Sequence, residues 1–170
     1  PPELAQEDTP SLAVIQHAVT FLENAEGYFP ELIVLLQPTA PLRQAHHIDQ
    51  AVQLLIMENA QAVVSVAPVP AHFNPHWVLV MDDGQRLRPF VAGSGPQHYP
   101  RRQSLPPVYY RNGAIYVARR TLITEENSLY GTAPLAYVMP PEASANIDGQ
   151  IDLWVAERLL GQLVETGGLP

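Results

Sequence analysis

The sequence contains no cysteine and no lysine. Without cysteine the chain can form no disulfide, no thiolate metal site and no cysteine nucleophile, and this composition is typical of a cytoplasmic protein. Nine basic residues, all of them arginine, stand against 17 acidic ones, which gives a net charge of −8. This balance excludes a nucleic-acid-binding domain that works by neutralising phosphates, although a few placed arginines can still hold one anionic ligand.

Long hydrophobic runs are also absent, since no apolar stretch approaches the ~18 residues that span a bilayer. Hydrophobic residues make up 46% of the chain and charged residues 15%, as expected of a globular protein rather than a disordered one. The length suits one domain, and we expect residues 1–170 to form it. Because the sequence begins with two prolines and no methionine, we expect it to be part of a longer protein.

Stretches with helical period alternate with short apolar runs. Helical spacing of apolar residues predicts helices over 11–26, 45–60 and 150–165. Apolar runs predict strands over 31–37, 62–69, 109–118 and 135–139. This alternation indicates an α/β domain with a mostly parallel sheet.

Between the second and third of these strands the pattern changes. Residues 77–90 (WVLVMDDGQRLRPF) predict an antiparallel hairpin that turns at Asp83-Gly84. Residues 91–107 are rich in Gly, Pro, Ser and Arg and predict a long loop. A loop of that length is usually functional or mobile.

A stiff loop follows the first predicted strand. The sequence LLQPTAPLR (35–43) passes from apolar residues to Gln37 and then to two prolines, which fix φ and remove two donors. Open α/β sheets bind ligands at the carboxyl ends of their strands, and a glutamine can both donate to and accept from a sugar hydroxyl. Gln37 is therefore a candidate sugar-binding residue; alternatively, its amide bonds the backbone of an ordinary strand-to-helix turn.

Two further polar clusters lie downstream. Arg101, Arg102 and Gln103 occupy the long loop, and adjacent arginines in an acidic protein indicate either a carboxylate or phosphate site or a solvated basic patch. Asn112 and Gly113 interrupt a predicted strand. A glycine there permits close approach of a ligand, to which Asn112 can offer its amide, or permits a plain β-bulge.

Carboxylates gather just before the last predicted helix, in NIDGQID (146–152). Asp148 can cap that helix, and it can also contact Mg²⁺, which prefers oxygen ligands; the two roles are compatible. The histidines predict no metal site: His72 and His76 are four residues apart, but they lie in a predicted loop that contains a proline. The sequence has no GxSxG, P-loop or GxGxxG motif.

Taken in order, these stretches resemble the acylneuraminate cytidylyltransferase family, the CMP-sialic acid synthetases and their relatives. LLQPTAPLR followed by RRQ and then NGAIY is the specific pattern, and the resemblance runs through nearly the whole chain. It implies a Rossmann-like nucleotide-sugar transferase fold with three layers. It also implies a homodimer and an antiparallel insertion, here residues 71–107, that serves dimerisation and sugar binding.

The activity that the resemblance implies is transfer of CMP from CTP to the anomeric hydroxyl of a nonulosonic acid such as N-acetylneuraminate, with release of pyrophosphate and with Mg²⁺ as cofactor. It assigns the catalytic carboxylate to Asp148 and the metal contacts to Asp148 and Asn146. The substrate-binding residues that it implies are Gln37, Thr39, Arg43, Arg101, Arg102, Gln103, Asn112 and Gly113.

The chain departs from the family pattern in three respects. Asn146 stands where the family's D-I-D motif has its first aspartate, so metal affinity is expected to fall or to depend on Asp148. Ala40 replaces a serine of the family's loop. The family's glycine- and lysine-rich segment that grips CTP is not recognised, so strand 31–37 is expected to lie at a sheet edge.

From these departures we expect the chain to supply the sugar-binding half of the enzyme and to be inactive alone. The alternative is a non-catalytic sugar-binding or dimerisation module, a degenerate paralogue. The sequence does not identify which nonulosonic acid is used.

Overall fold

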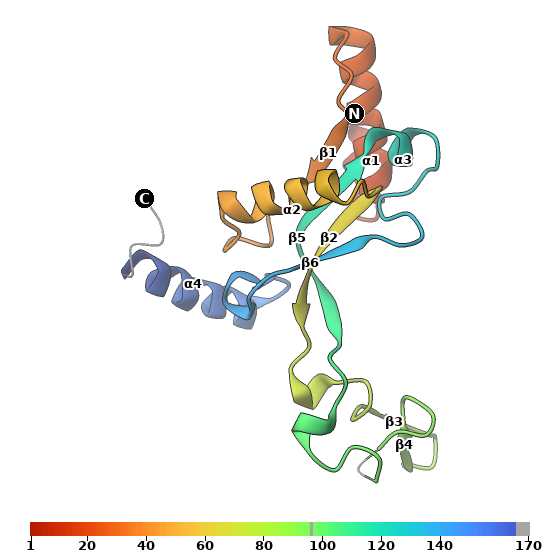
Figure 1. The fold of residues 1–170 in the computed structure, drawn as a ribbon, viewed down its shortest axis with the longest axis vertical. Helices are drawn as coiled ribbons and strands as arrows, with labels where there is room; N and C mark the ends of the chain where they lie inside the picture. Colours follow the sequence, from red (N-terminus) through yellow and green to blue (C-terminus); the bar gives the residue numbers. More distant parts are fainter. Residues whose placement is uncertain (96, 166–170) are drawn as a thin grey trace. The chain divides into compact units, whose positions relative to one another are not determined.

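The computed structural model describes residues 1–95 and 97–165. The chain divides into two compact units (Figure 1). The larger unit contains Pro1–Val66 and the chain from Arg111 onward, and the smaller unit is Ala67–Tyr110. The stretch that the sequence predicts as an insertion, 71–107, thus falls within a unit of its own.

A four-stranded sheet forms the centre of the larger unit. Its strands, in spatial order, are β1 (Leu32–Leu35), β5 (Tyr109–Arg119), β2 (Ala62–Pro68) and β6 (Leu135–Val138). β2 and β6 are parallel, whereas β1 and β5 are antiparallel. The predicted α/β class is confirmed, with both strand orientations in the sheet. Among the strands of the described residues, β1 stands at one end of this order.

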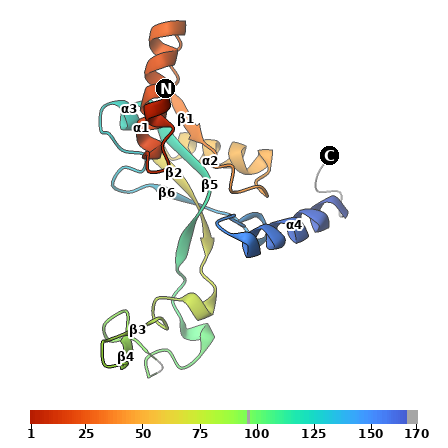
Figure 2. The ribbon, with the colours of Figure 1, turned by 180° about the vertical axis from the view of Figure 1, so that it is seen from behind.

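Helices cover both faces of this sheet and give three layers. The helices are α1 (Ser11–Phe21), α2 (Ala45–Met57), α3 (Arg120–Thr124) and α4 (Gln150–Glu165), with short helical turns at Pro2–Leu4, Leu22–Glu26 and Pro141–Ala143. α1 and α3 pack on one face through Ile15, Val19 and Leu122. α2 packs on the opposite face through Ala51 and Leu55, as the front view in Figure 1 and the back view in Figure 2 show.

β1 contributes to both packed faces. Ile33 and Leu35 pack with the cluster under α1, and Leu32 and Val34 pack with the cluster under α2. Because successive side chains of a strand point to opposite faces, an uninterrupted apolar run is what such a strand requires. The run that predicts this strand therefore reflects burial on two sides.

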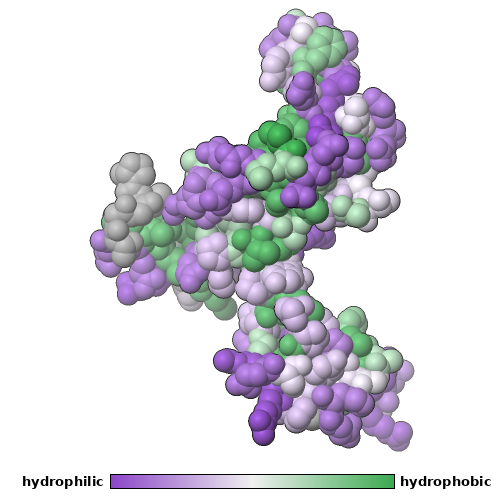
Figure 3. All heavy atoms as spheres, in the orientation of Figure 1, coloured by the Kyte–Doolittle hydropathy of each residue, from purple (hydrophilic) through white to green (hydrophobic). Residues whose placement is uncertain are grey.

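α4 is an amphipathic helix that leaves apolar residues exposed. Ile151 is 70% and Trp154 is 61% exposed, and Ala156 is its buried contact with the rest of the unit; hydrophobic patches are visible along it in Figure 3. Its first turn is capped by Asp152, whose Oδ2 accepts from the backbone N–H groups of Asp148 and Gly149. The prediction that Asp148 caps this helix is therefore wrong, because the capping carboxylate is that of Asp152. No helix among residues 1–95 and 97–165 is long and apolar enough to cross a membrane.

The smaller unit is built around a two-stranded hairpin, with two short helical turns at Ala71–Phe73 and Arg102–Ser104. β3 (Leu79–Met81) and β4 (Leu87–Pro89) are antiparallel, which confirms the predicted hairpin. The turn is held by Asp82, whose Oδ1 accepts from the N–H groups of Gly84 and Arg86. Gln85 N–H donates to the Asp82 carbonyl at 3.0 Å, so the chain turns at Asp83-Gly84 as predicted, and Gln85 follows with a positive φ of 59°.

The start of α2 depends on a neutral histidine, and this makes stability depend on pH. His47 is 5% exposed, and its Nδ1 accepts a hydrogen bond from the backbone N–H of Gln44 at 3.1 Å. Burial, and secondarily the neighbouring charge of His46, lowers the pKa of His47. The folded state therefore resists protonation, because a protonated Nδ1 can no longer accept this bond.

We expect the free energy of unfolding to fall as the pH drops below about 6.5, the ordinary pKa of histidine. The sign follows because the unfolded chain binds a proton there that the folded chain does not. Chemical denaturation between pH 7.5 and 5 measures the slope, and His47→Gln should reduce it. The same change at His17, an exposed histidine of α1, serves as the comparison variant; an equal slope in all three proteins would contradict the assignment.

Candidate functional site

The loop after β1 is held rigidly against β5. Ala40 N–H donates to the carbonyl of Gln37 at 3.3 Å and closes a turn. Arg43 Nη1 donates to the same Gln37 carbonyl at 3.2 Å and to the Ala114 carbonyl of β5 at 2.8 Å. Burial lowers the pKa of Arg43, but a guanidinium remains charged in proteins. Arg43, which the sequence predicts to bind substrate, here fastens the loop to the sheet.

Gly113 is the floor of the site. Its φ is +74°, a conformation that residues with a Cβ rarely adopt. A Cβ placed on it lies 2.7 Å from Gln37 Oε1 and 3.2 Å from Asn146 Oδ1. The amides of Gln37 and Asn146, from two distant segments, therefore meet over the bare backbone of Gly113, as the motif predicts for a close approach.

The segment before α4 closes the other side. Ile147 N–H donates to the Thr39 carbonyl at 2.8 Å, and Thr39 Oγ1 donates to Asn146 Oδ1 at 2.7 Å. Asn146 Nδ2 in turn donates to Asp148 Oδ2 at 2.7 Å. Thr39, Asn146 and Asp148 thus form one hydrogen-bonded chain beside Gln37, and Asp148 is its exposed end.

The oxygen ligands available at this site fit only a weakly bound divalent cation. Among the described residues no group of three histidine, cysteine or acidic side chains converges. Asp148 brings one carboxylate, the Asn146 oxygen already accepts from Thr39, and Asp152 is occupied in capping α4. Mg²⁺ is commonly held by one or two carboxylates together with substrate phosphates, so Asp148 fits as a single contact of that kind.

Asn112 lies inside the protein instead of lining the site. It is 1% exposed. Its Oδ1 accepts from Ser65 Oγ at 2.6 Å and from Ala114 N–H at 3.2 Å, and its Nδ2 donates to Ser144 Oγ at 2.9 Å. The amide that the sequence offers to a substrate is thus fully engaged, and in this structure Asn112 supports the neighbouring Gly113.

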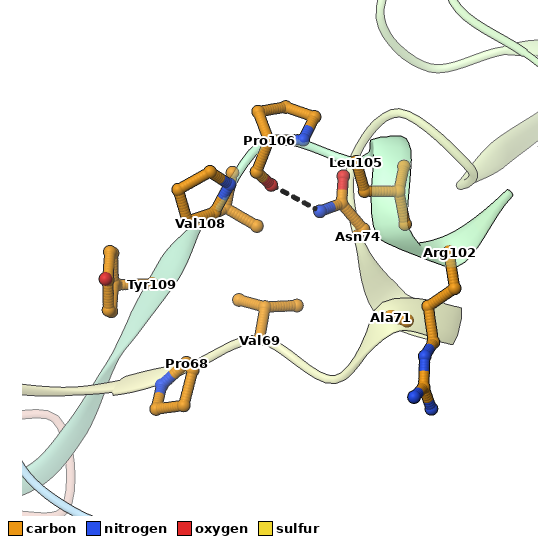
Figure 4. A pocket seen from close by; sticks show the side chains of 10 residues that line it. Pro68, Val69, Ala71, Asn74, Arg102, Leu105, Pro106, Val108 and Tyr109 are labelled. Atoms are coloured by element: carbon orange, nitrogen blue, oxygen red, sulfur yellow. Dashed lines mark hydrogen bonds between the residues drawn. The ribbon is translucent and has the colours of Figure 1, made fainter. Parts of the chain in front are cut away.

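The loop arginines belong to the smaller unit. Arg101, Arg102 and Gln103 are exposed around the turn Arg102–Ser104. Arg102 stands at the rim of a pocket of about 290 Å³, with its guanidinium turned outward (Figure 4). Asn74 lies in the wall and donates to the Pro106 carbonyl at 3.1 Å. The rest of the lining, from both ends of the unit, is mainly proline and aliphatic: Pro68, Val69, Ala71, Leu105, Pro107, Val108 and Tyr109.

The predicted site residues therefore divide between the two units. Gln37, Thr39, Gly113, Asn146 and Asp148 meet within the larger unit. The arginine cluster belongs to the smaller unit. Sequence reasoning missed the two buried serines that engage the amide of Asn112, because a serine in an apolar strand or beside a proline-rich turn carries no local signal of its partner.

Comparison with known proteins gives consistent relatives. No protein-family model matches the chain. The N-acylneuraminate cytidylyltransferase of Streptococcus agalactiae serotype V is 30% identical over 151 residues, 89% of this chain and 34% of that protein. The enzyme of the same name from Escherichia coli O18:K1:H7 is 32% identical over 157 residues, 92% of this chain and 35% of that protein. The CMP-N,N'-diacetyllegionaminic acid synthase of Legionella pneumophila is 33% identical over 135 residues, 78% of this chain and 55% of that protein.

A solved structure shares the fold. It is that of a CMP:2-keto-3-deoxy-manno-octonic acid synthetase complexed with CTP, with a TM-score of 0.58 and 14% identity, covering 92% of this chain and 70% of that chain. At this identity it bears on the fold alone, and it confirms the Rossmann-like architecture. The chain spans about a third of the length of the Streptococcus and Escherichia relatives. By sequence, about nine tenths of the chain is similar to part of the N-acylneuraminate cytidylyltransferases.

Proposed function

We propose that the residues gathered around Gly113 bind the sugar acid in an enzyme that transfers CMP from CTP to a nonulosonic acid and releases pyrophosphate. The observation that carries the proposal is the meeting of Gln37 and Asn146 over Gly113, with Asp148 bonded to Asn146. Two prolines and Arg43 hold the loop of Gln37 rigid. Rigid amides and a carboxylate are what a polyhydroxylated ligand requires, since they donate and accept in fixed directions.

Each residue has a role that follows from its surroundings. The Gln37 amide orients sugar hydroxyls, and Thr39 holds the Asn146 oxygen in place through its hydroxyl. The Asp148 carboxylate, at the exposed end of the chain of hydrogen bonds, can hold a proton-donating hydroxyl of the sugar or a cation. For the sugar carboxylate the family resemblance implies an arginine of the smaller unit, Arg102 or Arg101, whose planar fork suits a carboxylate.

Asp148 would be the residue to hold Mg²⁺, with Asn146 beside it. When bound, the cation offsets the charge of the triphosphate. Catalysis of phosphoryl-type transfer consists mostly of positioning and charge stabilisation. The part assigned to the described residues is therefore to fix the sugar so that its anomeric hydroxyl faces the α-phosphate of CTP.

The first test is calorimetric titration of the chain with N-acetylneuraminate. We expect binding by the wild type and at least ~10-fold weaker binding by Arg102→Glu, because a charge-assisted hydrogen bond is worth ~1.5–3 kcal/mol and ~1.4 kcal/mol is tenfold. Arg86→Glu makes the same charge change in the hairpin of the same unit and serves as the control. N-acetylglucosamine, which has no carboxylate, should bind wild type and Arg102→Glu alike.

Two outcomes would contradict the assignment. No binding of the acid by the wild type at millimolar concentration would exclude the site. An equal loss of affinity in Arg86→Glu would mean that the effect of Arg102→Glu comes from the net charge of the unit and not from a contact of Arg102. Pyrophosphate release with CTP and Mg²⁺ is measured in the same samples. Because the chain covers about a third of its enzyme relatives, we expect these 170 residues to bind without turnover.

A non-catalytic sugar-binding or dimerisation module is the second candidate. Asn146 favours it, because its amide donates to Asp148 and leaves a single carboxylate at the place of the family's acidic pair. Such a module binds the acid but gives no turnover even when a nucleotide-binding partner polypeptide is supplied. Turnover in that mixture supports the transferase instead.

We also propose that the hairpin of the smaller unit forms a homodimer contact. Leu79, Met81 and Leu87 are exposed hydrophobic residues of β3 and β4, and large exposed apolar patches mark interaction sites.

A further inference from the structure

We propose that Asn112 is a positioning residue that sets the spacing between Gly113 and Asn146, and so the geometry at which the amides of the site meet. It deepens the proposed function, because the site that it positions is the one assigned to the sugar acid. The starting point is that Asn112, although fully buried, makes hydrogen bonds within its own strand and to two distant segments.

The first connection fixes β5. Asn112 Oδ1 accepts from Ala114 N–H, two residues on, and so clasps the backbone around Gly113. Ser65 Oγ of β2 donates to the same oxygen at 2.6 Å and accepts from Ile115 N–H at 2.7 Å. Side chains of β2 and β5 therefore take part where a regular ladder uses backbone groups, and they hold the backbone on both sides of Gly113 in place.

The second connection fixes the segment before α4. Asn112 Nδ2 donates to Ser144 Oγ, and Ser144 Oγ donates to the Pro140 carbonyl at 2.8 Å. Ser144 ends the short helical turn Pro141–Ala143 and stands two residues before Asn146. The chain of contacts therefore closes on itself, since Asn146 Oδ1 lies over Gly113, the residue next to Asn112.

The contacts from Asn112 through Ser144 and Asn146 back to Gly113 form a closed ring, which explains why the site needs a buried amide at position 112. Only a side chain with an acceptor at one end and donors at the other can bind Ser65 and Ser144 together. No buried polar side-chain atom among the described residues lacks a partner, so the network is complete, and complete buried networks hold a single geometry. A change in it should displace Asn146 and Gln37 rather than only loosen the core.

The test uses Ser144→Ala, which removes one bond of the ring without touching the site. The direct readout is NMR of the side-chain NH₂ groups of Gln37 and Asn146 in the free protein, which needs no ligand. We expect both signals to move in Ser144→Ala. The matched control is Ser94→Ala: Ser94 is likewise buried, at 6% exposure, and bonds His76 Nδ1 at 2.6 Å in the smaller unit. The two variants lose comparable hydrogen bonds, but only one should move the site signals.

Binding of N-acetylneuraminate supplies the second readout. We expect Ser144→Ala to weaken it about fivefold, the equivalent of one hydrogen bond of ~1 kcal/mol, and Ser94→Ala to leave it unchanged. Unmoved Gln37 and Asn146 signals in Ser144→Ala, or equal movement in Ser94→Ala, overturn the inference. If Ser144→Ala does not fold, Ser65→Ala removes the opposite end of the ring and is judged by the same signals. A wild type that binds no sugar acid refutes the proposed function and leaves the NMR result to decide the role of Asn112.

Discussion

Replacing Gly113 by alanine is expected to abolish measurable binding of the sugar acid. The Cβ falls 2.7 Å from Gln37 Oε1, closer than carbon and oxygen can approach, and 3.2 Å from Asn146 Oδ1. Gln37 can move only by leaving the place where its amide meets Asn146. Because each ~1.4 kcal/mol is a factor of ten in affinity, displacement of two polar contacts worth ~1 kcal/mol each predicts at least a ~30-fold loss.

The same change also destabilises the fold. A residue with a Cβ at a φ of +74° carries strain of about 1–3 kcal/mol. Calorimetric titration and thermal melting of Gly113→Ala measure the two effects separately, and binding should be compared well below the melting temperature.

Gly27→Ala separates strain from collision. Gly27 has a φ of +64°, and nothing lies within 4 Å of a Cβ placed on it. This variant should lose stability to a similar degree and keep wild-type affinity. Equal affinity in Gly113→Ala and Gly27→Ala would mean that the meeting of Gln37 and Asn146 over Gly113 has no part in binding.

The layers of the fold were predictable from the sequence because each element buries its residues with the period of its own geometry. β1 and β2 contribute to two core clusters and so appear as apolar runs, which in β2 only Ser65 interrupts. The orientation of the strands was harder to predict, because an apolar run is the same in a parallel and in an antiparallel strand. In the structure β5 pairs antiparallel with β1. The hairpin turn was predicted correctly at Asp83-Gly84, where the Asp82 carbonyl accepts from Gln85 N–H. The left-handed conformation of Gln85, the residue after the pair, was not predicted.

The candidate site was predictable where a residue type is nearly unique in what it permits. Gly113 marks a close approach because its missing Cβ leaves room for Gln37 and Asn146. Asn112 carried the opposite difficulty: an amide is equally suited to a ligand or to a buried network, and only its partners, Ser65 and Ser144, distinguish the two. Those partners lie 47 and 32 residues away in sequence, beyond the reach of any local pattern.

Met81→Glu is expected to convert a homodimer of this chain into a monomer. In the hairpin Met81 pairs with Leu87, and Leu79 pairs with Pro89. Directly opposite residues of an antiparallel pair share a face, so these apolar side chains form one surface, with Leu79, Met81 and Leu87 at 47%, 67% and 63% exposure. A lone two-stranded hairpin is marginally stable in water, and a second copy would supply the cover that this face lacks.

The size of the effect follows from symmetry. A two-fold interface contains the same residue twice, so burial of an unpaired glutamate at ~2 kcal/mol or more per copy amounts to ~4 kcal/mol, about a thousandfold in the dissociation constant. Sedimentation velocity at micromolar concentration measures the change. Arg88 lies on the opposite face, paired with Val80, so Arg88→Glu alters the charge by more than Met81→Glu does and should leave the dimer intact. A wild type that sediments as a monomer would remove the homodimer from the proposal, and loss of the dimer in both variants would place the contact elsewhere than on the apolar face.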